Sequence, residues 1–217
     1  MASQGRGRGG CRRQLKWPPG RVDGCKRPQE TAGKRSAGRA VERHHGMEQQ
    51  GAARPDGPTF GFLTVVESAA HGVFGGYLLV DVLGRPVEFH CTTPVKVSRA
   101  QQILYGPTLH GHLHGRQIGA TLLAEAKAAP DVVLTDTESM LQVRPHTGLP
   151  VALVRRAEAA DGGAGFTIGA ARVRPHETDA PRETAVRERL VELGATVDLC
   201  EPFERIRAAI DEAQRHS

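Results

Sequence analysis

FGFLTVVESAAHGVFGGYLLVDVLGRPVEFHCT, residues 60–92, is the stretch that decides the fold. It holds three runs rich in β-branched and aromatic residues, at Phe60–Glu67, Val73–Val82 and Pro86–Thr92. Runs of this composition, separated by Gly and polar residues, predict strands. The second and third runs are joined by Leu83-Gly84-Arg85, a short connection with glycine that predicts a hairpin. We therefore expect the domain to open with an antiparallel three-strand meander.

A helix is expected directly after the meander. Ser98 is followed three residues later by Gln101, which is the spacing of a capping box at a helix start. Gly106-Pro107 should interrupt this helix, because proline lacks the amide hydrogen that a helix interior needs. A second helical stretch then runs from about residue 108 to residue 128.

Three glycines in that second stretch share one helix face. Gly111, Gly115 and Gly119 stand four residues apart, and each costs about 1 kcal/mol relative to alanine in a helix interior. Close approach to a neighbouring backbone would offset this cost. We expect either a helix that lies tightly on the sheet or a dimer contact through this face.

The rest of the chain alternates between strand and helix signals. Further strands are expected at residues 131–136, 150–155, 166–173 and 196–200, with helical segments at 137–144, from Pro181 to Gly194, and from Pro202 onward. The fold class is therefore α/β. We expect a single domain over residues 59–217, with a mixed sheet and an extra C-terminal helix-strand-helix.

Charge is distributed unevenly along the chain. Residues 1–46 hold twelve Lys and Arg against three Asp and Glu, whereas residues 47–217 hold seventeen against twenty-one. Residues 1–58 are expected to form a disordered basic tail, because they have too few apolar residues to fold. Three interpretations stay open: a nucleic-acid-binding arm, a targeting peptide, or sequence upstream of a true start at Met47, which we favour. The acidic body gives no support for nucleic-acid binding.

Cysteine spacing and hydropathy argue against three classes of protein: those with structural zinc sites, those with disulfide frameworks and those that span a membrane. The four cysteines include no CxxC pair, which argues against a structural zinc site or a disulfide framework. The sequence contains no run of 18 apolar residues, so it predicts no membrane-spanning helix. We expect a cytoplasmic protein.

Acidic residues stand at the ends of two expected strands. Glu67 closes the first strand, and Asp136 follows the fourth in the phrase LTDTESML. In a βββαβ order, strands one and four run parallel and adjacent, so the two carboxylates could meet and hold Mg²⁺ or Mn²⁺. Such an ion can polarise a phosphoryl oxygen and activate water. The alternative is that each acid is a solvated loop residue.

Four motifs follow one another in an order that is known from one superfamily. They are Glu67, the glycines of Gly75-Gly76-Tyr77, the helix start Ser98–Gln101 and the phrase Thr135-Asp136-Thr137. Between about residues 60 and 141 the chain resembles the ribonuclease H-like superfamily. That family has an acid on strand one, GGYG-like glycines on strand two, an N-R-x-E-type helix start and a TDS-type acid on strand four. The resemblance implies a ribonuclease H-like fold and a Mg- or Mn-dependent nuclease.

The resemblance also assigns residues to roles. Glu67 and Asp136 would be the catalytic metal ligands, with Glu88, Asp81 or Glu138 as a substitute for the missing second acid. Arg99 or Lys96 would meet phosphate. Glu67 stands where the family prefers aspartate. Gln101 and Gln102 occupy the helix that supplies the family's second acid.

Two further signals suggest other functions. The run GGYLLVDVLGRPVEF, residues 75–89, is similar to the central hairpin of roadblock or profilin-like dimerisation modules, which implies an interaction domain with a homodimer or protein partner. We favour such a non-catalytic module over the nuclease. His110 and His114 lie four residues apart, the spacing of metal ligands on a helix, but no third ligand can be identified and His112 should point elsewhere. Surface or helix-packing histidines are the favoured interpretation.

Overall fold

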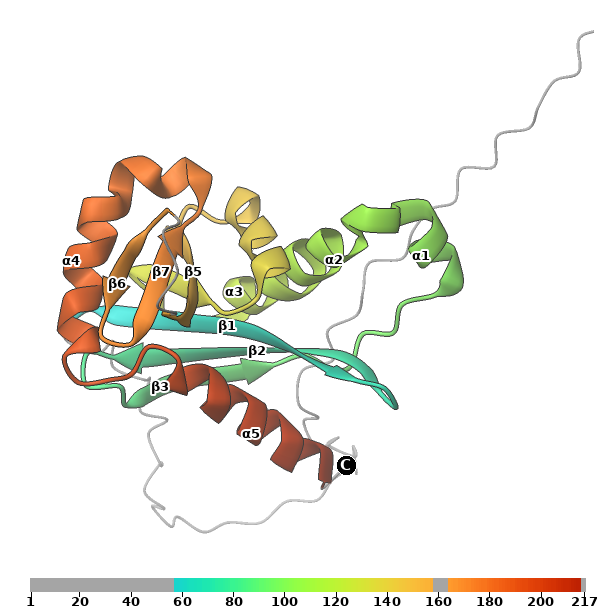
Figure 1. Cartoon of the computed structure of the whole chain (residues 1–217). Helices are drawn as coiled ribbons and strands as arrows, with labels where there is room; N and C mark the ends of the chain where they lie inside the picture. Colours follow the sequence, from blue (N-terminus) through green and yellow to red (C-terminus); the bar gives the residue numbers. More distant parts are fainter. Residues whose placement is uncertain (1–56, 158–163, 216–217) are drawn as a thin grey trace, which may run out of the picture.

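The computed structural model describes residues 57–157 and 164–215 (Figure 1). The expected tail falls outside this part of the chain up to residue 56, and so does the expected start at Met47. The described residues form a seven-stranded sheet in the order β3-β2-β1-β4-β5-β7-β6. The strands are β1 (Thr59–Ser68), β2 (Gly72–Asp81), β3 (Pro86–Cys91), β4 (Val132–Thr135), β5 (Val151–Arg156), β6 (Phe166–Ile168) and β7 (Ala171–Pro175).

The opening meander is confirmed. β1 pairs antiparallel with β2 along its whole length, from Thr59 opposite Asp81 to Ser68 opposite Gly72, and β2 pairs antiparallel with β3. β4 then returns parallel to β1, and β5 lies parallel to β4. The sheet is therefore mixed, and β1 lies near its centre with a neighbour of each direction. The expected α/β class holds.

Helical segments cover the two faces of the sheet. They are α1 (Arg99–Tyr105), η1 (Gly106–Thr108), α2 (Leu109–Gly111), the π-helical η2 (His112–Gly119), α3 (Ala120–Glu125), η3 (Glu138–His146), η4 (Glu177–Arg182), α4 (Glu183–Gly194) and α5 (Glu201–Arg215). The capping box at Ser98 is present as expected. The Ser98 hydroxyl accepts from the Gln101 amide at 3.2 Å, and the Gln101 side chain accepts from the Ser98 amide at 2.8 Å.

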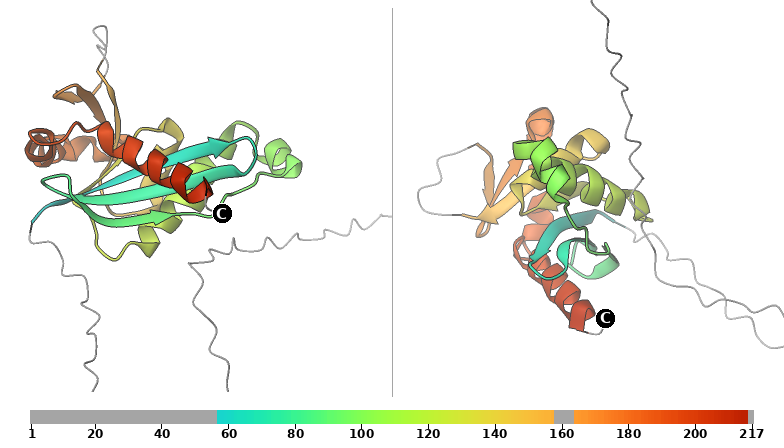
Figure 2. Two further views of the ribbon diagram at one scale, coloured as in Figure 1. Left: turned by 90° about the horizontal axis from the view of Figure 1, so that it is seen from below. Right: turned by 90° about the vertical axis from the view of Figure 1, so that its right-hand side faces the viewer.

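Strand alternation divides the apolar residues into two cores. Phe60 and Phe62 of β1 face α4 and α5, where Phe62 meets the Phe203 ring edge-on at 5.2 Å. Leu63 faces the opposite side and joins the core beneath η2, α3 and η3. In the right-hand view of Figure 2, α5 lies on one side of the β1–β2 strands and the segment from α1 to α3 on the other. Side chains at successive positions of β1 therefore belong to different layers.

Two expected strands are corrected. Residues 166–173 form a hairpin, because Gly169 takes a left-handed φ of 55° and turns β6 back onto β7. Residues 196–200 form a turn in place of a strand. There, the Asp198 carboxylate accepts from the Cys200 amide at 3.0 Å, just before α5 begins. The C-terminal unit therefore consists of α4, a turn and α5.

The glycine face contacts η3. A Cβ on Gly115 would lie 2.4 Å from the backbone carbonyl carbon of Gln142, and one on Gly119 would lie 2.8 Å from the Met140 sulfur. At Gly111 the nearest atom is the Cγ of Gln142, at 3.1 Å. The close approach is therefore to η3, within the same chain. The expected close approach is therefore confirmed, with η3 in place of the sheet, and the expected dimer contact stays a prediction.

One buried ion pair fixes η3 relative to η4. The fully buried Asp179 carboxylate accepts two hydrogen bonds from Arg144, at 2.6 and 2.9 Å, and one from the Val151 amide at 3.1 Å. Burial alone would raise the pKa of Asp179, but the hydrogen bonds and the Arg144 charge outweigh it and hold the pKa below its usual value.

No helix among the residues with described positions is long and apolar enough to cross a membrane.

Replacing Gly115 by alanine should destabilise the domain by about 1–3 kcal/mol, because the new methyl group must push η2 away from the backbone of η3. Urea unfolding measures this change. Gly111→Ala is the matched control, since its methyl group meets only the flexible Gln142 side chain. Equal effects of the two substitutions would contradict the packing described here.

Replacing Asp179 by asparagine should cost about 3 kcal/mol of unfolding free energy, because Arg144 loses its buried counter-charge. The carboxylate's contribution is present above the usual aspartate pKa of about 3.9. It is lost as the pH falls through the lower pKa of the folded state. Urea titrations between pH 2 and 7 should therefore show less acid destabilisation in Asp179→Asn than in the parent.

Candidate metal centre

Glu67 lies near the end of β1, on the face that carries Leu63 and Val65. Alternation along the strand places its side chain beneath the layer formed by α2 and η2. The side chain is exposed at the rim of the sheet.

Asp136 lies on the other face. Leu63 pairs with Thr135 in the parallel β1–β4 ladder, so the next residues along, Thr64 and Asp136, are level with each other. The Thr64 hydroxyl donates to the Asp136 carboxylate at 2.6 Å, and Arg207 of α5 forms an ion pair with the same carboxylate. Asp136 is thus engaged beneath α5. The structure does not bring it together with Glu67.

The substitute acids are engaged elsewhere, Asp81 in an ion pair with Arg85 at 2.8 Å. Glu88 on β3 accepts hydrogen bonds from the Lys127 and Ala128 amides, at 2.9 and 3.4 Å, and so ties the end of the α3 segment to the sheet. Glu138, the first residue of η3, forms ion pairs with Arg155 and Arg174. None of these contacts involves Glu67 or Asp136.

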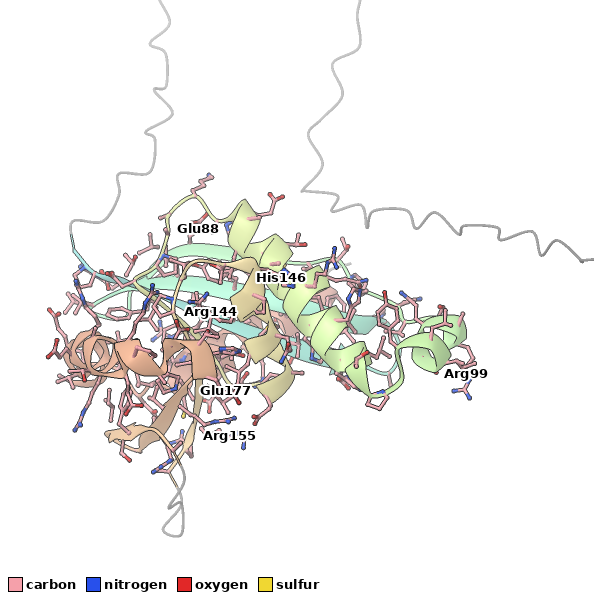
Figure 3. All side chains as sticks on the ribbon, turned by 90° about the horizontal axis from the view of Figure 1, so that it is seen from above. Glu88, Arg99, Arg144, His146, Arg155 and Glu177 are labelled. Atoms are coloured by element: carbon pink, nitrogen blue, oxygen red, sulfur yellow. The ribbon has the colours of Figure 1, made fainter. Side chains whose placement is uncertain are left out.

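The two expected phosphate-binding residues lie around the start of α1. Arg99 is its first residue and donates to Gln102 at 3.1 Å, while Lys96 is exposed in the preceding segment. Figure 3 shows Arg99 at the far end of the α1 arm, away from Arg155. Lys96, by contrast, follows Val95, which bridges to Val73, the residue opposite Glu67, so its backbone lies near the end of β1.

The side chains that do converge are Glu67, His110 and His114. Each offers one ligand atom, and the three atoms all lie within 4.8 Å of one another. Glu67 comes from β1, His110 from α2 and His114 from η2. The rings of the two histidines meet edge-on, with their centroids 5.5 Å apart.

His114 is the buried member of this cluster, with 3% of its surface exposed. Burial lowers the pKa of His114 and the neighbouring His110 lowers it further, while Glu67 acts in the opposite direction. The neutral imidazole favoured by this net shift is the form that binds metals.

The two ring nitrogens of His114 have different surroundings. Nδ1 lies 2.7 Å from the Ser139 hydroxyl. Nε2 is buried and has no hydrogen-bond partner within the described part of the chain. A hydrogen bond to one ring nitrogen of a metal-binding histidine fixes the ring and aims the other nitrogen. The Ser139 contact is placed to do this for Nε2.

His112 points away from the cluster, as expected. Its ring stacks on Tyr105 with centroids 4.5 Å apart, and Gln117 lies 3.2 Å from its Nε2.

The backbone that carries His114 is π-helical. The Ala120 amide bonds to the Gly115 carbonyl, five residues earlier. Short π-helical segments are rare and occur frequently at functional sites.

A comparison with protein-family models finds no match for this chain, and a comparison with curated proteins finds none either. Its function must therefore be argued from its own residues.

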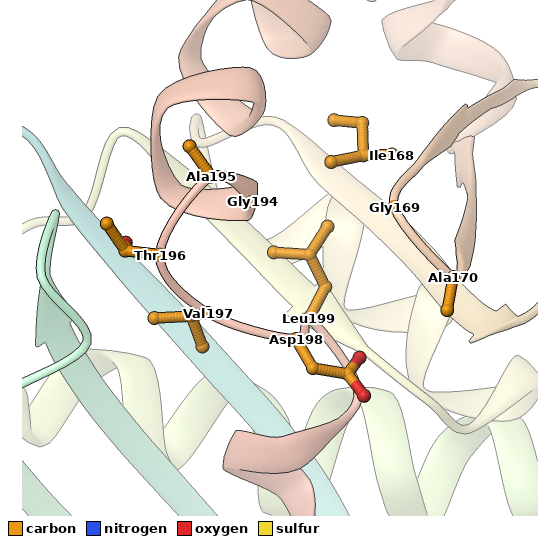
Figure 4. Close-up of a pocket in the computed structure, with 9 residues that line it drawn as sticks. All are labelled: Ile168, Gly169, Ala170, Gly194, Ala195, Thr196, Val197, Asp198 and Leu199. Atoms are coloured by element: carbon orange, nitrogen blue, oxygen red, sulfur yellow. The ribbon is translucent and has the colours of Figure 1, made fainter.

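A surface cavity of about 310 Å³ lies elsewhere, between the β6–β7 turn and the connection from α4 to α5 (Figure 4). Residues 168–170 and 194–199 line it. Asp198, at its edge, pairs with Arg156 at 3.2 Å. None of the site residues expected from the sequence lines this cavity.

The donor set of the His/Glu cluster suits a first-row transition metal. Zn²⁺ binds histidine nitrogen and carboxylate oxygen at about 2.0–2.2 Å, which requires ligand atoms about 3–4 Å apart. Small movements of the exposed Glu67 and His110 side chains would close the present spacing. Three protein ligands leave further coordination positions open, the arrangement of catalytic rather than structural zinc sites.

The sequence contained part of this answer. The i, i+4 spacing of His110 and His114 was visible, but Glu67 was paired with Asp136 and no third ligand was assigned to the histidines. Glu67 could have been predicted as the third member of the cluster if the face of β1 that lies under α2 had been known.

Proposed function

We propose that this domain binds a divalent transition metal through Glu67, His110 and His114, and that the open side of the metal serves hydrolytic chemistry. The observation that carries the proposal is the convergence of three ligand atoms within 4.8 Å, one of them from a buried histidine with an unpartnered nitrogen. When bound, such a metal lowers the pKa of a coordinated water and polarises a substrate oxygen.

A ribonuclease H-like scaffold is the second part of the proposal. The strand order β3-β2-β1-β4-β5, with β2 antiparallel and β4 parallel to β1, supports the resemblance read from the sequence. The two-carboxylate chemistry of that superfamily receives no support, because Asp136 is paired with Arg207 on the face opposite Glu67. We therefore favour a histidine-based metal centre over a Mg- or Mn-dependent nuclease.

An interaction role is a second candidate, favoured by the surface of α1. Ile103 and Leu104 are 68% and 77% exposed, and α1 has no buried residue. A homodimer through this surface would cover both side chains. Sedimentation of residues 47–217 should then show a dimer, and Ile103→Ser with Leu104→Ser should convert it to a monomer. A parent protein that sediments as a monomer would contradict this role.

Zn²⁺ titration of residues 47–217 by calorimetry tests the metal centre. We expect one site of micromolar affinity or tighter, and a loss of affinity of at least tenfold in both Glu67→Gln and His110→Ala. These two residues are exposed, so their replacement should leave folding intact. Co²⁺ absorption spectra provide a second readout of nitrogen and oxygen ligation.

His112→Ala is the matched control, because this histidine lies on the same helical stretch but outside the cluster. It should bind Zn²⁺ like the parent. Asp136→Asn should do the same. The proposal fails if the parent binds no metal, or if the control variants lose as much affinity as the cluster variants.

A further inference from the structure

The first residue of η3 is held by two arginines. Arg155 of β5 contacts one carboxylate oxygen of Glu138 at 2.6 Å, and Arg174 of β7 contacts the other. All three side chains are accessible, with 58%, 40% and 55% of the surface of Arg155, Arg174 and Glu138 exposed. The Glu138 carboxylate is therefore bound by two arginines at a place open to solvent, and we call the Arg155–Arg174 pair the grip.

A third arginine stands beside this grip. Arg155 pairs across the sheet with Arg172, so the two side chains share a face. Arg174 is two residues further along β7 and lies on that face as well. Three guanidinium groups thus belong to the face that carries the grip, and the planar arginine fork is suited to bidentate contact with carboxylate or phosphate.

The grip adjoins the metal cluster. Glu138 is followed in the chain by Ser139, whose hydroxyl contacts His114. Leu153, two residues before Arg155, faces the same core as Leu63 on the strand that carries Glu67. β1 and β5 are separated only by β4, a lateral distance of about 10 Å. Leu63, Thr135 and Leu153 are level across the three strands, so Glu67 lies two residues, about 7 Å, further along than Arg155.

We propose that Arg155 and Arg174 form an oxyanion subsite for the ligand of the neighbouring metal, and that the Glu138 carboxylate occupies this subsite until the ligand displaces it. The proposal rests on the metal centre proposed above. The ligand is an organic anion with a phosphate or carboxylate group at the arginines and a second oxygen or nitrogen donor toward the metal.

Displacement is feasible because the ion pairs of Glu138 are exposed. Water and salt screen exposed pairs, so they hold weakly. A phosphate dianion carries more charge than a carboxylate and can accept hydrogen bonds from both arginines at once. Once released, Glu138 is free to turn toward solvent.

Binding of inorganic phosphate to the Zn²⁺-loaded protein, measured by calorimetry at low salt, tests the subsite. We expect millimolar affinity or tighter in the parent and at least a tenfold loss in Arg155→Gln/Arg174→Gln. Glu138→Gln should bind phosphate several-fold more tightly, because it removes the internal competitor. Acetate titrated in parallel distinguishes the two ligand classes, since a carboxylate-specific subsite would prefer it to phosphate.

Arg189→Gln is the matched control. Arg189 is 57% exposed and pairs with Asp131 at 3.7 Å, next to the opposite end of β4. It should leave phosphate binding unchanged. Zn²⁺ affinity should be the same in the parent and the double arginine variant, so failure of the metal centre and failure of the subsite give different results.

Proximity to the metal is tested separately by the ³¹P linewidth of phosphate with Co²⁺-loaded protein. The parent should broaden the line more than the double arginine variant at equal metal loading. The proposal is overturned if phosphate affinity is unchanged in that variant. It is equally overturned if phosphate binds through the arginines but its line is not broadened, because the subsite would then be independent of the metal.

Discussion

The parallel pairing of β1 with β4 is the constraint on which the rest of the structure depends. Its register sets Leu63 against Thr135 and thereby decides which residues of the two strands are level with each other. Because side chains alternate across a strand, the same register decides which of two separate cores each residue joins. A shift by one residue would move Thr64 and Glu67 to the opposite faces.

The two faces consequently have different chemistry. Under α5, the Asp136 carboxylate accepts a hydrogen bond from the Thr64 hydroxyl and forms an ion pair with Arg207, which balances its charge. Under α2 and η2, Glu67 lies close to two histidines, one of which is buried and has a ring nitrogen without a hydrogen-bond partner among the described residues. The first arrangement stabilises the packing of a helix on the sheet. The second places three potential metal-ligand atoms close together near the surface.

Local signals in the sequence predicted the meander, the capping box at Ser98 and the helix from Pro202 onward, because each depends on residues close together in the chain. The site was predicted less well. Strand ends were visible, but the face on which Glu67 lies depends on the register between strands 72 residues apart in sequence, as for the Thr64–Asp136 contact. The hairpin at Gly169 was missed because Gly169 and Ala170 are small and leave no polar break in the sequence, although the buried positions change phase there, from Phe166 and Ile168 to Ala171 and Val173. The glycine face predicted a close approach, but the partner η3 carried only a weak helical pattern.

The π-helical geometry of η2 has a consequence for how this chain tolerates change in length. A π-helical turn accommodates more residues than an α-helical one, as the bond from the Ala120 amide to the Gly115 carbonyl shows. Removing one residue here would favour the more stable α-helical bonding, because an α-helical turn closes with one residue fewer, and the flanking segments would keep nearly the same phase. The positions of His114 and of the glycines relative to η3 would then depend on where in the segment the residue is removed. Within this segment, the number of residues is therefore a determinant of the Glu67/His110/His114 cluster, as residue identity is.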